Sequence, residues 1–342
     1  MQQIDPFTFP DWNECILTIP YSSIFHTTNW LRVLQESYGY RPYYFASFKG
    51  EKLAVLLPFM EVKSWITGVR GVSLPFSDYC EPLLDETAHY PELLDQVILA
   101  ARRLRWKFLE MRGADALFRG APPYTFYYRH ILVLPGNEEV VFSGLRSNYR
   151  AKIRKAYRND LKVEILRSPD AIAEYYRLHC LTRKRHGLPP QPTSFFKKIH
   201  EHIISKGFGF VILVSHKGRN VAGAIFFYFG NRAIYKFGAS DTGYQHLHLN
   251  YLLFWHAIRW LCHNGYKELC FGRSVTNNKG LVQFKGGWGT KESSLYYYKY
   301  DLKTMSFVET LNQADENGYD IFKKMPIKLL KLAGSVLYPH IG

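Results

Sequence analysis

Several features that mark common protein classes are missing from this sequence. Its five cysteines include no Cys-x-x-Cys pair and are odd in number, which disfavours a disulfide framework or a zinc site and favours a reducing compartment. No apolar run approaches the roughly 20 residues that a membrane-spanning helix needs. The N-terminus has neither the basic nor the apolar segment of a secretory signal. We therefore expect a cytoplasmic protein.

Acidic residues are scarce relative to basic ones. Lys and Arg total 44 against 29 Asp and Glu, for a formal charge of +15. A field of this sign attracts polyanions, so phosphate-bearing substrates, tRNA and an anionic membrane surface are all compatible partners. The charge does not choose among them.

The signatures of two enzyme classes are also absent. The sequence has no His-Glu-x-x-His motif and no Gly-x-Ser-x-Gly nucleophile elbow, so we expect neither a metal site nor a hydrolase triad. Four histidines do fall in one region, and we expect them to serve packing: His246, His248, His256 and His263.

The same order of predicted elements occurs in both halves of the chain. The order is a hairpin with Lys-Gly at its tip, a strand, a helix, a strand and a late strand, the late strands being 124–134 and 295–302. Such a repeat is typical of duplicated domains. We predict an α/β fold with mixed sheets, in domains 1–138 and 139–308, followed by a basic amphipathic tail over 309–342. A tail of this kind can lie on a membrane interface or pack on the protein itself.

A basic helix is predicted between the two halves. Arginines recur at every fourth position, which places them on one stripe of a helix, beside an apolar row that would dock it. We expect Arg150 and Arg154 of this stripe to contact a phosphate chain or tRNA, the alternative being an ordinary solvated helix face.

The stretch 265–290 holds the leading candidates for catalysis. A short strand ends near Arg273, and Lys285 precedes three glycines within four residues. Glycines let a backbone approach a ligand, and open α/β sheets bind ligands just past their strand ends. A fixed cation there can stabilise an oxyanion or hold a carboxylate or phosphate. The alternative is a solvated lysine and a structural arginine.

Three residues outside this stretch are further candidates for substrate binding. Asp78 and Glu81 occupy a turn-rich loop, where either can hold or deprotonate an amine, although surface acids in loops are common. Tyr297 lies in a strand whose tyrosines alternate between core and cleft.

An ordered set of segments resembles the FemAB-like transferases, which are twin-domain relatives of the GNAT acyltransferase fold. The segments are 147–159, 175–192, 237–274 and 280–289. The resemblance implies two tandem GNAT-like domains and transfer of an acyl or aminoacyl group to an amine. It also places Lys285 where the family carries an active-site lysine. Two features of relatives are missing, namely a coiled-coil arm and the glycine-rich pyrophosphate loop, which is replaced by 244–250 and whose absence disfavours an acetyl-CoA donor.

The resemblance leads to one main hypothesis and two alternatives. The main one is an aminoacyl or acyl transferase acting on an amine of a cell-envelope precursor, peptidoglycan or polysaccharide, with no tightly bound cofactor and aminoacyl-tRNA or acyl-CoA as donor. One alternative is an acyl-CoA- or acyl-carrier-dependent N-acyltransferase of an amino sugar or small amine. The other is a non-catalytic basic module that binds tRNA or an anionic membrane. For the protein as a whole, the expected location is the cytoplasm or the periphery of the inner face of the membrane.

Overall fold

The computed structural model describes residues 2–50, 52–84, 91–115, 117–118, 120–310 and 318–342. By its contacts the chain divides into two compact units, here called the first unit and the second unit. The first unit comprises residues 1–127, 294–314 and 336–342, and the second comprises 128–293 and 315–335. Part of the predicted tail, 311–317, lies outside the described residues.

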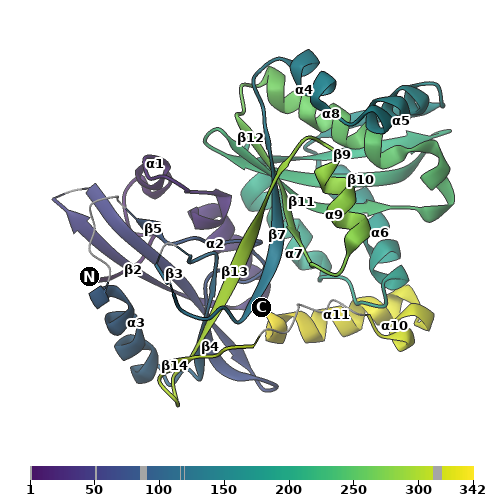
Figure 1. Cartoon of the computed structure of the whole chain (residues 1–342). Coiled ribbons are helices and arrows are strands. Elements are labelled where there is room, and N and C mark those ends of the chain that lie inside the picture. Colours follow the sequence, from purple (N-terminus) through teal and green to yellow (C-terminus); the bar gives the residue numbers. More distant parts are fainter. Residues whose placement is uncertain (1, 51, 85–90, 116, 119, 311–317) are drawn as a thin grey trace. The chain divides into compact units, whose positions relative to one another are not determined.

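The first unit contains the elements β1 (Gln2–Ile4), α1 (Trp12–Leu17), the 3-10 turn η1 (Ile24–His26), α2 (Thr28–Tyr38), β2 (Arg41–Lys49), β3 (Lys52–Ser64), β4 (Gly68–Val72), β5 (Leu83–Leu84), α3 (Pro91–Arg103), β6 (Phe108–Arg112), most of β13 (Lys291–Asp301) and β14 (Ser306–Phe307). Its strands form a sheet in the order β1-β2-β3-β4-β6-β13 (Figure 1). Only β4 and β6 are parallel neighbours in this order. The predicted hairpin is confirmed, since Tyr43 of β2 pairs with Phe59 of β3.

The second unit contains most of β7 (Thr125–Val133), then α4 (Glu138–Gly144), α5 (Ser147–Tyr157), β8 (Leu161–Leu166), α6 (Pro169–Arg185), α7 (Thr193–Ile199), the π-helical turn η2 (His200–Ile204), β9 (Gly209–His216), β10 (Arg219–Phe229), β11 (Arg232–Ser240), the 3-10 turn η3 (Thr242–Leu247), α8 (Leu249–His263), β12 (Glu268–Ser274), α9 (Lys279–Gly286), α10 (Asp320–Lys324) and the start of α11 (Ile327–Ile341). Its strand order is β7-β12-β11-β10-β9-β8. The mixed α/β class is therefore confirmed.

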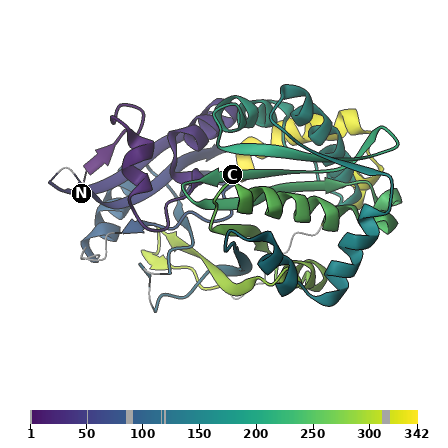
Figure 2. The ribbon, with the colours of Figure 1, turned by 90° about the horizontal axis from the view of Figure 1, so that it is seen from above.

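Helices cover both faces of the second unit's sheet. Phe210 and Ile212 of β9 face the core that α5 and α8 complete, whereas Val211 points to the other face, because side chains alternate along a strand. On that face α6 packs closely, with Tyr175 beside Gly223 of β10. Figure 2 shows α8 running along the strands that it covers.

The sequence predicts that each late strand joins the sheet of its own half. In the structure, the late strand of the first half joins the second unit, and the late strand of the second half joins the first unit. Leu132 of β7 pairs with Leu269 of β12 in the second unit. Tyr298 of β13 pairs with Met111 of β6 in the first. The observed division therefore differs from the predicted boundaries at 138/139 and 308/309. Alternation along a sequence identifies a strand but not its partner, which long-range packing selects.

The tail forms helices α10 and α11, and α11 has two different faces. Leu330 is fully buried, and a Cβ on Gly334 would lie 2.0 Å from the carbonyl oxygen of Pro190. Leu329 and Leu332, in contrast, are 54% and 62% exposed. Over the described residues, no helix combines the length and the apolar character needed to cross a bilayer.

Candidate functional site

The centre of the candidate site is a bulge in β12. Cys270 pairs with Ile131 of β7, and the next pair in register is Arg273 with Arg129, so two residues of β12 lie opposite the single residue His130. One of those two is Gly272, whose φ of +69° is a conformation that side-chain-bearing residues rarely adopt. Bulges of this kind redirect backbone groups and are frequent beside active sites.

The bulge carbonyls bind the ammonium group of Lys285. Nζ donates to the carbonyl oxygen of Gly272 at 3.1 Å and to that of Arg273 at 3.0 Å. The Lys285 side chain is only 3% exposed. A buried cation requires close polar partners, and these carbonyls hold it at a defined point. The two leading candidates, Lys285 and Arg273, are thus in direct contact through the Lys285 ammonium group and the Arg273 backbone carbonyl.

Helix α9 carries Lys285 in its last turn and positions it at the bulge. The helix begins after Asn278, whose side chain accepts a hydrogen bond from the Leu281 amide at 3.1 Å. Its last turn is fixed by Tyr149 of α5, whose hydroxyl donates to the carbonyl of Phe284 at 2.9 Å. A Cβ on Gly287 would lie 2.0 Å from the Tyr149 ring. The interpretation that Gly287 allows approach to a ligand is therefore wrong, because this glycine allows α9 to pack on α5.

Strands β11 and β12 pair over only part of their length. Their parallel register runs from Arg232 with Glu268 to Ile234 with Cys270. Beyond it, β11 continues to Ser240 and β12 passes through the bulge, with no further pairing between them among the described residues. Diverging strand ends are where α/β sheets accept ligands.

A cavity of about 170 Å³ lies where β11 ends and α8 begins. Its lining includes Ser240, Gln245, His248, Asn250 and Tyr251. His248 occupies the N-cap of α8 with a left-handed φ of +61° and makes no side-chain cap there. The helix N-terminus therefore directs the positive end of its dipole toward this cavity.

Lysines of α5 add positive charge beside the cavity. Lys152 Nζ donates to the Tyr251 hydroxyl at 2.9 Å and lies 4.6 Å from the centre of its ring. Burial, followed by the charges of Lys155 and Lys152, lowers the pKa of His248. The cavity thus suits the phosphate of a ligand. The sequence signal for these lysines was their place next to the arginine stripe.

The predicted arginines of α5 make different contacts. Arg150 Nη1 donates to the carbonyl oxygen of Ser143, and the Arg154 guanidinium lies 5.6 Å from the centre of the Phe142 ring. Both contacts tie α5 to α4. A role of these arginines in binding substrate or tRNA stays a prediction.

The remaining candidates come together in the first unit. The Tyr297 hydroxyl donates to the carbonyl oxygen of Asp78 at 2.6 Å, and the Arg112 guanidinium lies 5.5 Å from the Tyr297 ring. His26 Nε2 is 2.9 Å from the carbonyl oxygen of Glu81. Burial lowers the pKa of His26 to about 4, so its ring is neutral at pH 7 and donates to that carbonyl. The loop of Asp78 and Glu81 is thus held through its backbone.

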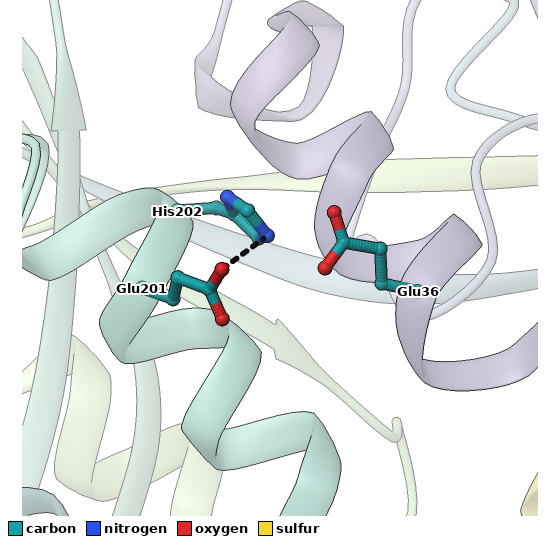
Figure 3. A group of neighbouring side chains, drawn as sticks. All are labelled: Glu36, Glu201 and His202. Atoms are coloured by element: carbon teal, nitrogen blue, oxygen red, sulfur yellow. Dashed lines mark ion pairs between the residues drawn. The ribbon is translucent and has the colours of Figure 1, made fainter.

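The four histidines of the second half do not share a common centre. His256 Nε2 lies 3.1 Å from the Tyr157 hydroxyl, and His263 Nε2 lies 3.1 Å from Glu138. A separate pair occurs on η2, where His202 Nε2 is 3.7 Å from Glu201 (Figure 3). Glu36, also drawn there, belongs to α2 of the first unit. Two ligand atoms from the second unit are fewer than the protein ligands of a typical zinc site.

Part of the second unit is similar to a known domain family. Residues 143–286 match the Acetyltransferase (GNAT) domain family. This segment, which is less than half of the chain, therefore resembles GNAT acetyltransferase domains. It contains the diverging strands, the cavity at α8, the bulge and Lys285, so the candidate site lies inside the matched segment.

Solved structures share the fold over most of the chain. FemX is 13% identical with a TM-score of 0.66, and the match covers 86% of this chain and 97% of FemX. A tandem GNAT protein from the clavulanic acid biosynthesis pathway is 10% identical with a TM-score of 0.55, covering 88% and 97%. The C-terminal domain of a putative lysylphosphatidylglycerol synthetase from Agrobacterium fabrum is 16% identical with a TM-score of 0.56, covering 79% and 86%. The predicted FemAB-like fold with twin GNAT domains is therefore confirmed. No curated protein matches the sequence.

Replacing Gly287 tests the packing that positions Lys285. We expect Gly287→Ala to lower the free energy of unfolding by about 1–3 kcal/mol, because the new methyl group overlaps the Tyr149 ring. Gly286→Ala is the matched control, since its Cβ would meet nothing closer than 4.0 Å, and we expect a change within about 0.5 kcal/mol. Urea denaturation followed by tryptophan fluorescence measures both. Equal stability of the two variants would contradict this role of Gly287.

Proposed function

We propose that the chain transfers an aminoacyl or acyl group to an amine of a cell-envelope precursor, either a peptidoglycan or a polysaccharide building block. The observation that carries this proposal is the buried Lys285 ammonium at the β12 bulge, inside the segment that matches the GNAT family and next to diverging strands. The fold shared with FemX and with a putative lysylphosphatidylglycerol synthetase supports an aminoacyl donor. The formal charge of +15 supports a donor or acceptor that carries phosphate.

The proposed role of Lys285 follows from the chemistry of acyl transfer. An amine attacks the ester or thioester carbonyl of the donor, and negative charge develops on the carbonyl oxygen. An ammonium that is already oriented in a site with little water stabilises this charge without reorganisation. The Gly272 and Arg273 carbonyls supply that orientation, and the Arg273 side chain is proposed to bind the substrate.

Other candidates are assigned to binding. Lys152 and Lys155 beside the α8 cavity are proposed to hold a phosphate of the donor or of a nucleotide-linked acceptor. Arg150 and Arg154 are proposed to contact the tRNA backbone. In the first unit, Tyr297 and the loop of Asp78 and Glu81, which its hydroxyl contacts, are proposed to bind the acceptor. No tightly bound cofactor or metal is required by this mechanism.

An acyl-CoA-dependent N-acyltransferase of an amino sugar or small amine is the second candidate. The observation that favours it is the cationic cavity at the N-terminus of α8. There, lysine side chains can bind the pyrophosphate that a glycine-rich loop binds in ordinary GNAT enzymes. A non-catalytic module that binds tRNA or a membrane is the third candidate.

Donor binding distinguishes these candidates. We expect aminoacyl-tRNA to bind at least about tenfold more tightly than uncharged tRNA, a difference of about 1.4 kcal/mol, because the site recognises the ester. The measurement is a fluorescence titration at several stated salt concentrations, since the basic surface also gives nonspecific tRNA affinity. Equal affinity for both tRNAs together with tight acetyl-CoA binding would favour the second candidate. Binding without turnover of any donor would favour the third.

Removal of the Lys285 charge tests the mechanism. We expect Lys285→Met to lower kcat by roughly 10²–10³-fold, the loss typical of removing one oxyanion donor. Lys279→Met is the matched control, because Lys279 lies exposed in the first turn of the same helix. Circular dichroism confirms that each variant is folded. Turnover of Lys285→Met at the wild-type rate would show that this ammonium takes no part in the reaction.

The exposed face of α11 supports a peripheral contact with the inner face of an anionic membrane. Leu329 and Leu332 lie next to the exposed Lys328, and apolar and cationic side chains together favour such a surface. We expect the protein to float with phosphatidylglycerol liposomes but not with phosphatidylcholine liposomes. The variant Leu329→Ser/Leu332→Ser should lose flotation, whereas Leu17→Ser/Leu99→Ser, with similar exposure, should keep it. Flotation that survives the first variant excludes this face.

A further inference from the structure

A buried histidine lies opposite the bulge that binds Lys285. His130 of β7 is fully buried and lies opposite the two bulge residues of β12 in the register. Its Nε2 lies 3.0 Å from a carboxylate oxygen of Glu292, at the start of β13. Within the part of the chain that the structure describes, neither ring nitrogen makes a hydrogen bond of good geometry, and Nδ1 lacks even the close carboxylate that Nε2 has. Buried polar atoms are normally paired, so an orphaned acceptor at this position indicates a missing partner.

The charged groups around His130 set its protonation. Burial is the main reason that its pKa is lowered, and the Lys285 ammonium lowers it further, while Glu292 raises it. Arg273 is the charged residue of β12 next to the bulge. The ring is therefore neutral at pH 7. The ring proton then resides on Nε2, which faces the Glu292 carboxylate, so Nδ1 carries a free lone pair.

We propose that His130, oriented by Glu292, is the base that accepts the proton lost by the attacking amine while Lys285 stabilises the oxyanion. This inference rests on the proposed function. The amine nitrogen forms the new C–N bond, and the carbonyl π electrons move onto the oxygen. The N–H proton passes to Nδ1. When the bond between the acyl carbon and the leaving oxygen or sulfur breaks, the leaving atom takes the proton from Nδ1. His130 therefore ends the cycle neutral.

The geometry explains why this assignment needs both groups. Lys285 binds the carbonyls of the bulge and His130 lies opposite the bulge in the register, and neither would suit the role of the other. The ammonium has donors only, whereas the neutral imidazole has an acceptor. The Glu292 side chain is 47% exposed, so the pair connects a buried base with a carboxylate that reaches solvent. A carboxylate behind a histidine is a known way to orient the ring and stabilise its protonated form.

The test is the pH profile of kcat/KM for transfer from alanyl-tRNA, or from acetyl-CoA if that is the donor bound, to a nucleotide-linked muramyl peptide. We expect His130→Gln to lower kcat/KM by 10²–10⁴-fold and to abolish the acidic limb of the profile. We expect Glu292→Gln to lower kcat/KM about tenfold, because loss of the orienting charge weakens the base. It should also move the acidic limb to lower pH, because the carboxylate raises the pKa of His130. The controls His216→Gln and Glu164→Gln should keep the wild-type profile, since the His216 ring contacts the Asp160 carbonyl and the Tyr244 ring, and Glu164 pairs with Lys162 at the surface.

The outcomes separate this inference from the proposed function. Failure of the proposed function appears as no transfer by the wild-type protein from any donor. Failure of the inference appears as wild-type transfer that His130→Gln retains within about twofold with its acidic limb in place. If His130→Gln does not fold, the Glu292→Gln variant provides the test. The Glu292 side chain is half exposed, so we expect this variant to fold. An acidic limb that does not move in this variant overturns the assignment. Histidine NMR titration of the full chain gives a second readout, in which Glu292→Gln should lower the pKa of His130.

Discussion

The contact of the Lys285 ammonium with the carbonyls of Gly272 and Arg273 is the constraint on which the candidate site depends. A buried cation without partners is too costly to keep, so the bulge and α9 each require the other. The bulge turns two carbonyls out of the β-ladder, and the lysine satisfies them. The same contact fixes the end of α9, whose last residues pack on Tyr149, and Trp288 behind them is fully buried.

Helix α5 shows how one amphipathic segment serves three surfaces. Its tyrosine and isoleucine row enters the core, where Tyr149 supports α9. Arg150 and Arg154 contact α4. Lys152 reaches Tyr251 at the cavity near the start of α8. Several basic residues of this helix therefore have specific partners, either on α4 or at the cavity. The same residues also contribute to the overall positive field of the protein.

The electrostatics of the second unit favour an anionic ligand between two positive regions. Lysines and a helix N-terminus lie beside the α8 cavity, and Lys285 lies at the bulge beyond the point where β11 and β12 separate. A neutral imidazole next to a fixed ammonium is then a useful combination, because burial lowers the pKa of the histidine and the ammonium lowers it further. The proposed acid–base chemistry and oxyanion stabilisation thus share one bulge of β12.

Local patterns in the sequence determined the class of fold, the β2–β3 hairpin and Lys285 as a leading candidate, because periodicity and turn residues are local properties. Only the tertiary structure decided which sheet each late strand joins, since β7 pairs with β12 and β13 with β6, and pairing depends on packing between distant residues. It also decided that Gly287 accommodates Tyr149. His130 lies in an ordinary strand pattern, and nothing local relates it to Glu292, 162 positions later in the chain. Folding brings these two side chains to 3.0 Å, because the register of β7 on β12 and the start of β13 are set by the whole unit.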